Sequence, residues 1–156
     1  MKVGDRAPEF SLASQDGSTV RLGELLERGS VVLYFYPKDK TPGCTAEAGA
    51  LRQSYREIRP LGAEVVGVSS DSVDSHKDFA TECDLPFKLA SDPNGELRKK
   101  YGVPSSLGLL PGRVTYVIDS EGVVRHIFSS QFQPTRHVKE ALKALGAAEG
   151  GTPATG

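Results

Sequence analysis

The stretch Tyr34-Phe35-Tyr36-Pro37-Lys38-Asp39-Lys40-Thr41-Pro42-Gly43-Cys44-Thr45 joins an apolar strand to a helix through a sharp turn. The strand belongs to the apolar run Val31–Tyr36, which is typical of a strand covered on both faces. Thr41 suits the N-cap of the helix, and Pro42 suits its first position, where a missing N–H costs least. Cys44 is therefore the third helical residue, where free backbone N–H groups and the helix dipole favour a thiolate.

The rest of the chain alternates between strand and helix patterns. Asp16-Gly17 and Glu121-Gly122 predict hairpin turns, and Gly102–Gly112 is predicted to be a loop. The predicted strands are Phe10–Ala13, Thr19–Arg21, Val31–Tyr36, Glu64–Ser69, Phe87–Ala90, Arg113–Ile118 and Val123–Phe128. The predicted helices are Leu22–Leu26, Pro42–Ile58, Val73–Cys83 and Glu96–Tyr101. Thr135 is the candidate N-cap of a last helix that runs to about Leu145.

This order of elements predicts an α/β fold. A central mixed β-sheet with helices on both faces and an N-terminal β-hairpin is the arrangement of a thioredoxin-like fold. We expect a single domain over residues 1–145, and a flexible C-terminal tail over residues 146–156, which are small and polar.

Composition excludes several classes of function. The chain has 156 residues and a formal net charge of −1, so no charge field favours nucleic acid or an anionic membrane. The sequence shows neither a signal-peptide pattern nor an apolar stretch of the ~20 residues that span a bilayer. Two cysteines are too few for a secreted disulfide framework, and we therefore expect a cytoplasmic protein.

Pro37, Thr41 and Cys44 match the Pro-x-x-x-Thr-x-x-Cys signature of peroxiredoxins. The longer stretch around them resembles the bacterioferritin comigratory protein, or peroxiredoxin Q, branch of that family. The similarity covers residues 1–145 through further segments, which are Val3-Gly4-Asp5, Ala7-Pro8-Glu9-Phe10, Val68-Ser69, Asp71-Ser72, His76, Leu85-Pro86-Phe87, Leu89-Ala90-Ser91-Asp92 and Arg113–Asp119. The resemblance implies a monomeric thiol-dependent peroxidase without a cofactor, which reduces hydrogen peroxide and organic hydroperoxides.

Cleavage of a peroxide needs a thiolate, oriented donors and a stabilised leaving oxygen. Cys44 is the candidate nucleophile and becomes a sulfenic acid. The backbone N–H groups of Gly43 and Cys44 are expected to donate to peroxide oxygens, and the Thr41 hydroxyl can donate or accept. Pro37 is expected to shield the thiolate from water. The resemblance makes Arg113 the active-site arginine, whose guanidinium always carries charge.

The resolving thiol is less clearly indicated. Many members of this branch carry it five residues after the first cysteine, where this chain has Gly49, and others carry it in the next helix, at the position aligned with Ala80. Cys83 lies one turn beyond Ala80, on the order of 15 Å from Cys44 along the helix, whereas a disulfide needs Cα atoms within about 7 Å. We favour a one-cysteine cycle with thioredoxin, glutaredoxin or a small thiol as reductant. The alternative is a Cys44–Cys83 disulfide reduced by thioredoxin.

Two further hypotheses use the same fold. A peroxide sensor would relay the oxidation of Cys44 to a partner protein, and a purely structural binding module would leave Cys44 with an ordinary thiol pKa. The absence of Cys-x-x-Cys argues against a disulfide reductase. No metal site is expected, because the three histidines lack ligand spacing with each other or with the cysteines; we predict that His76, His126 and His137 are solvated or packed.

Overall fold

The computed structural model describes residues 1–103, 105–106, 110–111, 113–129 and 134–150. Its centre is a five-stranded mixed sheet in the order β5-β4-β3-β8-β9. The strands are β3 (Ser30–Phe35), β4 (Ala63–Ser69), β5 (Lys88–Ser91), β8 (Val114–Ile118) and β9 (Val124–Ser129). β3, β4 and β5 run parallel to one another, whereas β8 and β9 are antiparallel to their neighbours. The mixed sheet of the predicted thioredoxin-like fold is confirmed.

One face of the sheet is covered by N-terminal elements and one later helix. The hairpin β1 (Ser11–Ala13) and β2 (Thr19–Arg21) is antiparallel, as the Asp-Gly pair predicted. Helices α1 (Leu22–Leu26) and α4 (Glu96–Tyr101) bury Leu22, Leu97 and Tyr101 in the same cluster as the sheet side chains that face them.

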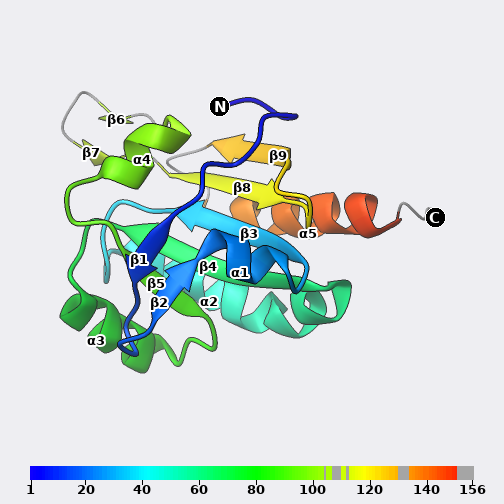
Figure 1. Cartoon of the computed structure of the whole chain (residues 1–156). Coiled ribbons are helices and arrows are strands. Elements are labelled where there is room, and N and C mark those ends of the chain that lie inside the picture. Colours follow the sequence, from blue (N-terminus) through cyan, green and yellow to red (C-terminus); the bar gives the residue numbers. More distant parts are fainter. Residues whose placement is uncertain (104, 107–109, 112, 130–133, 151–156) are drawn as a thin grey trace.

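The other face carries the longer helices α2 (Pro42–Ile58), α3 (Val73–Cys83) and α5 (Pro134–Gly150), with the 3₁₀ turn η1 (Arg59–Leu61) after α2. Figure 1 shows helices on both sides of the sheet, with α2 and α5 side by side. Helix α2 packs through an apolar stripe where its side chains are described, because Ala48, Leu51 and Ile58, spaced three or seven residues apart, are buried against this face.

Two segments differ from the expectation. The predicted loop 102–112 contains a short antiparallel pair, β6 (Ser105–Ser106) and β7 (Leu110–Pro111). The last helix runs from Pro134 to Gly150, so Thr135 lies inside it and is not its N-cap, and the first five residues of the predicted tail are helical. Two alanines and a glutamate in those five residues, all good helix formers, account for the extension. Residues 151–156 lie outside the described residues.

The register of the sheet places the key loops at one edge. Phe35 of β3 pairs with Val68 of β4 on one side and with Val114 of β8 on the other. The carboxyl ends of β3 and β4 and the start of β8 therefore meet at this edge. None of the helices formed by the described residues has the length and apolar composition that crossing a bilayer requires.

Candidate active site at the N-terminus of α2

Helix α2 begins at Pro42, so Thr41 precedes its first residue and Cys44 is its third, as predicted. The Thr41 carbonyl accepts the first intrahelical bond, from Thr45 N–H at 2.8 Å, and Thr41 Oγ1 donates to Lys38 O at 3.1 Å. The Gly43 and Cys44 amides thus belong to the first helical turn, where N–H groups have no intrahelical acceptor. The side chains of Pro42, Gly43 and Cys44 lie outside the described part of the chain.

The turn before α2 is held in an uncommon conformation. Lys40 has φ of 68°, in the left-handed region that residues with a Cβ seldom adopt. Pro37 follows Tyr36 directly and is half-buried. The backbone therefore reverses within four residues between the end of the strand and Thr41, which requires side-chain contacts to fix it.

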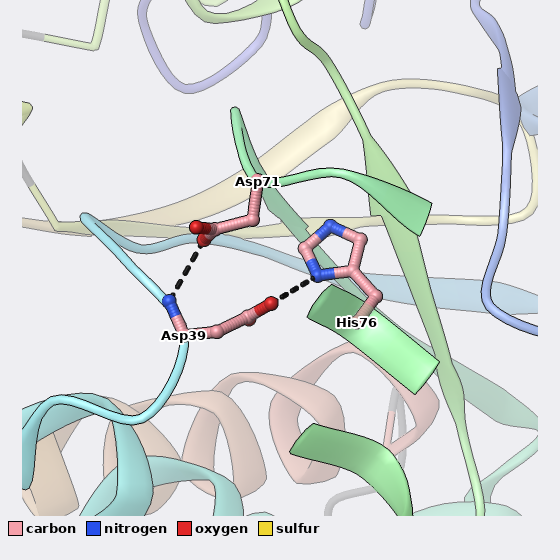
Figure 2. Close-up of side chains that lie close together, drawn as sticks. All are labelled: Asp39, Asp71 and His76. Atoms are coloured by element: carbon pink, nitrogen blue, oxygen red, sulfur yellow. Dashed lines mark hydrogen bonds and ion pairs between the residues drawn. The ribbon is translucent and has the colours of Figure 1, made fainter. Parts of the chain in front are cut away.

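Asp39 supplies those contacts. Its carboxylate is buried and accepts from Tyr36 Oη at 2.5 Å and from Ser75 Oγ at 2.8 Å, and it lies 2.7 Å from His76 Nδ1. The Asp39 N–H donates to Asp71 Oδ2 at 2.7 Å. Figure 2 shows Asp39 from the turn, Asp71 from the loop before α3 and His76 from α3 lying close together. The turn that carries Thr41 is thereby fixed to the loop before α3 and to its first turn.

The end of β3 is also held from the opposite face. Arg98 of α4 is buried and donates from Nη2 to Tyr36 O at 3.0 Å, and its guanidinium lies 5.9 Å from the centre of the Phe35 ring. The Arg98 and Leu97 N–H groups donate to the Asp92 carboxylate. Both faces of the sheet thus contribute to positioning the strand end before Pro37.

Arg113 lies at the same edge because the antiparallel pairing of β3 with β8 sets Val114 opposite Phe35. Only 4% of Arg113 is exposed, and its Nη1 donates to Glu47 Oε1 at 2.5 Å. Glu47 follows Cys44 by one turn of α2 and is fully buried. The structure therefore ties the predicted arginine, through Glu47, to the helix whose first turn holds the predicted cysteine.

Glu47 also faces α5. Its second oxygen, Oε2, is buried and has no hydrogen-bond partner among the described residues, and it lies 3.9 Å from Nδ1 of buried His137. The same His137 nitrogen lies 2.8 Å from Thr115 Oγ1. Burial raises the pKa of Glu47 to about 7, although the charge and hydrogen bond of Arg113, and then the Thr115 hydroxyl, lower it. A carboxyl group that changes protonation near neutrality thus lies one turn from Cys44.

Asp39, Asp71 and His76 could also be considered for a metal ion, since each offers one ligand atom and these atoms lie within 4.8 Å of one another. Protein donors already occupy these carboxylates: Asp71 Oδ2 accepts from Ser69 Oγ at 2.6 Å as well as from the Asp39 amide. His76 Nε2 lies 3.1 Å from Ala90 O, which suits an N–H donor. The cluster is therefore best explained as the support of the turn.

Cys83, the candidate resolving thiol, is the last residue of α3 and is half-buried against the core cluster beneath α2. Burial, and then the Glu82 charge, raise the pKa of the Cys83 thiol. The structure does not bring it to the N-terminus of α2 by any described contact.

No role could be assigned to Asp39, Glu47 or His137 from the sequence. The sequence holds one hint of a role for Glu47, because a charged residue lies between Cys44 and Ala48 on the face of α2 that carries the buried side chains. His76 and His137 are buried and His126 is half-buried beside Glu140, so the prediction that the histidines are packed or solvated is confirmed.

Sequence comparison finds peroxiredoxin relatives. Residues 3–127 match the AhpC/TSA family. Peroxiredoxin Q, chloroplastic, of Oryza sativa subsp. japonica is 51% identical over 143 residues, which cover 91% of this chain and 65% of the relative. The Arabidopsis thaliana protein of that name is 51% identical over 146 residues, which cover 93% of this chain and 67% of the relative. The chain thus spans about two thirds of the length of these relatives.

Solved structures agree with that result. Peroxidoxin BcpB from Mycobacterium tuberculosis superposes with a TM-score of 0.88 at 39% identity, covering 94% of this chain and 97% of that one. Bacterioferritin comigratory protein from Xanthomonas campestris superposes with a TM-score of 0.83 at 29% identity, covering 90% and 92%. The fold is therefore similar to that of these proteins.

Proposed function

This chain belongs to the AhpC/TSA family, in its peroxiredoxin Q group, and from that premise we propose that it is a thiol peroxidase acting through Cys44. The observation that carries the proposal is the position of Cys44 at the N-terminus of α2, with the buried Arg113 guanidinium bonded to the same helix one turn later. Amide dipoles and a permanent positive charge both favour the thiolate. We propose hydrogen peroxide and organic hydroperoxides as substrates, since the Xanthomonas relative is described by alkyl peroxide reduction.

In the proposed reaction, the Cys44 thiolate attacks one peroxide oxygen. An S–O bond forms, the O–O bond breaks, and the leaving oxygen takes one proton to become water or an alcohol, so that sulfur is oxidised and peroxide is reduced. The Gly43 and Cys44 amides and the Thr41 hydroxyl are the proposed donors to the two oxygens, and Arg113 stabilises the negative charge that develops on the leaving oxygen. Pro37 is the proposed shield between the thiolate and water.

Replacing the nucleophile tests this assignment. Cys44→Ser is expected to abolish peroxide consumption by the reduced protein, while the far-UV circular dichroism spectrum stays unchanged. Cys83→Ser is the matched control, because it removes the other thiol, and it should retain the first oxidation at the normal rate. Peroxide consumption by Cys44→Ser at the wild-type rate would overturn the proposal.

For the second half of the cycle we propose one catalytic cysteine and an external thiol. Cys83 lies at the far end of α3, is half-buried, and has a raised thiol pKa, which all disfavour its attack on a sulfenic acid at Cys44. Two structures of the Xanthomonas relative each carry one cysteine replaced by serine, and the two replaced cysteines are 36 positions apart. Cys44 and Cys83 of this chain are 39 positions apart, so the spacing differs. Thioredoxin, glutaredoxin or a small thiol is the proposed reductant.

Thiol titration after one equivalent of peroxide separates the two cycles. The one-cysteine cycle leaves one free thiol per chain, at Cys83, and a sulfenic acid at Cys44 that a dimedone-type reagent traps. Loss of both thiols, with an intramolecular Cys44–Cys83 link found by mass spectrometry, would replace this cycle with the disulfide route reduced by thioredoxin.

A peroxide sensor is the second candidate function. It is favoured by Gly49, which occupies the place of a resolving thiol in the same helix and would let oxidised Cys44 persist. A sensor should turn over slowly with every thiol reductant, whereas a peroxidase sustains steady-state turnover. A monomeric, cytoplasmic protein remains our proposal, although the plant relatives named above are chloroplastic.

A further inference from the structure

A buried carboxylate, Glu47, lies between α2, β8 and α5, and only one of its two oxygens is needed to position the Arg113 side chain. Arg113 Nη1 donates to Glu47 Oε1, and the second carboxylate oxygen, Oε2, is buried without a hydrogen bond among the described residues. A buried carboxylate oxygen without a hydrogen bond of good geometry is costly to ionise, although the neighbouring Thr115 hydroxyl partly favours the charged form. The basic group that faces it is His137, across 3.9 Å.

We propose that Glu47 and His137 hold one mobile proton behind Arg113, and that the position of this proton sets how much of the Arg113 charge acts on Cys44. When Glu47 is ionised, Arg113 compensates its charge, and the carboxylate opposes a thiolate one turn away on the same helix. When Glu47 is protonated, the Arg113 charge is free to stabilise the thiolate. Glu47 and His137 are thus positioning residues, and the inference rests on the proposed role of Cys44.

The geometry supports a link between the two proton sites. His137 Nδ1 lies 2.8 Å from Thr115 Oγ1, and a hydroxyl can either donate to a bare nitrogen or accept from an N–H. Protonation at Nδ1 would place a donor 2.8 Å from Thr115 Oγ1 and a positive charge 3.9 Å from Glu47 Oε2. The ring is fixed in place by Phe128, whose ring centre lies 4.6 Å away in an edge-on contact.

The charged and titratable groups around Glu47 come from three elements. Arg113 precedes β8, His137 belongs to α5, and Cys44 precedes Glu47 on α2 itself. Residues three positions apart on a helix have Cβ atoms about 5–6 Å apart, so negative charges on Glu47 and Cys44 repel each other when both groups are ionised. Burial raises the pKa of Glu47 to about 7, which is the range in which a reactive thiol also titrates. Two such groups lose their protons in steps that belong to the pair.

The test uses the Cys83→Ser protein, in which Cys44 is the single thiol, and measures its alkylation rate by iodoacetamide from pH 4 to 10. We expect two ionisation steps. Glu47→Gln in the same background keeps an acceptor oxygen for Arg113 but removes the negative charge, so the curve should collapse to one step whose midpoint lies roughly one pH unit lower. Glu64→Gln is the matched control, since Glu64 is a half-buried carboxylate bonded to Tyr55 and Arg59, and it should leave two steps.

A second substitution tests the histidine. His137→Asn removes the basic group that faces Oε2, so the step that belongs to Glu47 should move to higher pH. Three results would each overturn the inference. The Cys83→Ser protein itself could show a single step, Glu47→Gln could leave the midpoint unchanged or raise it, or His137→Asn could leave the curve unmoved. A single step in the Cys83→Ser protein is decisive without any substitution at Glu47, should Glu47→Gln fail to fold.

The peroxide reaction of the same samples keeps this inference separate from the proposed function. Two alkylation steps without any oxidation by peroxide would overturn the peroxidase and leave the shared proton standing. Rapid oxidation by peroxide with a single alkylation step would overturn the shared proton and leave the peroxidase standing.

Discussion

His76 Nδ1 lies 2.7 Å from Asp39 Oδ2, and this buried pair joins the turn before the Cys44 helix to the first turn of α3. Tyr36 Oη, at 2.5 Å from Asp39 Oδ1, extends the contact to the end of β3. The first turn of α2 therefore has its position set by a neighbouring helix and strand, as well as by its own sequence.

Removing the Asp39 carboxylate should destabilise the protein and disturb the site. Asp39→Ala leaves the Tyr36 hydroxyl, the Ser75 hydroxyl and His76 without their acceptor, which we expect to lower the free energy of unfolding by about 3 kcal/mol. Peroxide oxidation of Cys44 should slow as well. Urea denaturation and stopped-flow kinetics measure the two effects.

Asp78→Ala is the control, because Asp78 pairs with Lys40 at 3.9 Å on the surface. Exposed ion pairs are worth about 0–1 kcal/mol, so this variant should behave as wild type. Equal losses in Asp39→Ala and Asp78→Ala would show that the buried cluster does not support the turn.

Arg113→Lys keeps a positive charge but loses the planar set of donors. Because the proposed role needs donors in fixed directions toward both Glu47 and the leaving oxygen, we expect the peroxide oxidation rate to fall roughly 100-fold. Arg125→Lys, in the same hairpin but paired with Asp119 at the surface, is the control and should keep the normal rate. An unchanged oxidation rate in Arg113→Lys would show that Arg113 contributes only its positive charge, and not the direction of its N–H donors.

The contribution of Glu47 should make the free energy of unfolding fall as pH rises from about 5 to about 7. Burial raises the Glu47 pKa from 4.5 to about 7, so in this window the folded state binds a proton that the unfolded state has released. Stability then decreases with pH, by about 3 kcal/mol in total from this group. Urea denaturation at pH 5, 6, 7 and 8 measures the slope, which Glu47→Gln should reduce. An identical slope in wild type and Glu47→Gln would contradict the burial account.

Gly49→Ala should stabilise α2. A Cβ at Gly49 meets nothing within 4 Å, and alanine is preferred to glycine in a helix by roughly 1 kcal/mol. The rate of Cys44 oxidation should be unchanged, whereas any Cys44–Cys83 disulfide, which needs α2 to unwind, should form more slowly. Gly29→Ala should have the opposite sign, because Gly29 has φ of 151° and its Cβ would lie 1.8 Å from Gly62 O. Thermal unfolding that failed to separate these two variants would contradict the packing described around both glycines.

Local signals in the sequence were sufficient for much of this structure. Thr41 and Pro42 predicted the first residue of α2, and the Asp-Gly pair at residue 16 predicted the N-terminal hairpin, because caps and turns depend on a few adjacent residues. The bounds of α1, α3 and α4 were predicted for the same reason. The predicted end of α5 at Leu145 was wrong, because the helix-forming residues Ala147, Ala148 and Glu149 continue the helix past Gly146.

The candidate site required long-range information. Arg113 and Glu47 are 66 residues apart, and they meet because β8 pairs with β3 in one register. Asp39 and His76 are 37 residues apart and meet because parallel strands end at a common edge. Such pairings follow from strand order and register, which local patterns do not specify.

The central claim is that Cys44 is held as a thiolate by the first turn of α2 and by Arg113. Its most direct test is the rate at which one equivalent of hydrogen peroxide oxidises Cys44 in the Cys83→Ser protein between pH 4 and 10. We predict rapid, stoichiometric formation of a sulfenic acid, with a rate at pH 7 that is already a large fraction of its maximum. A rate that rises only above about pH 8.5, as for an ordinary thiol, would contradict it.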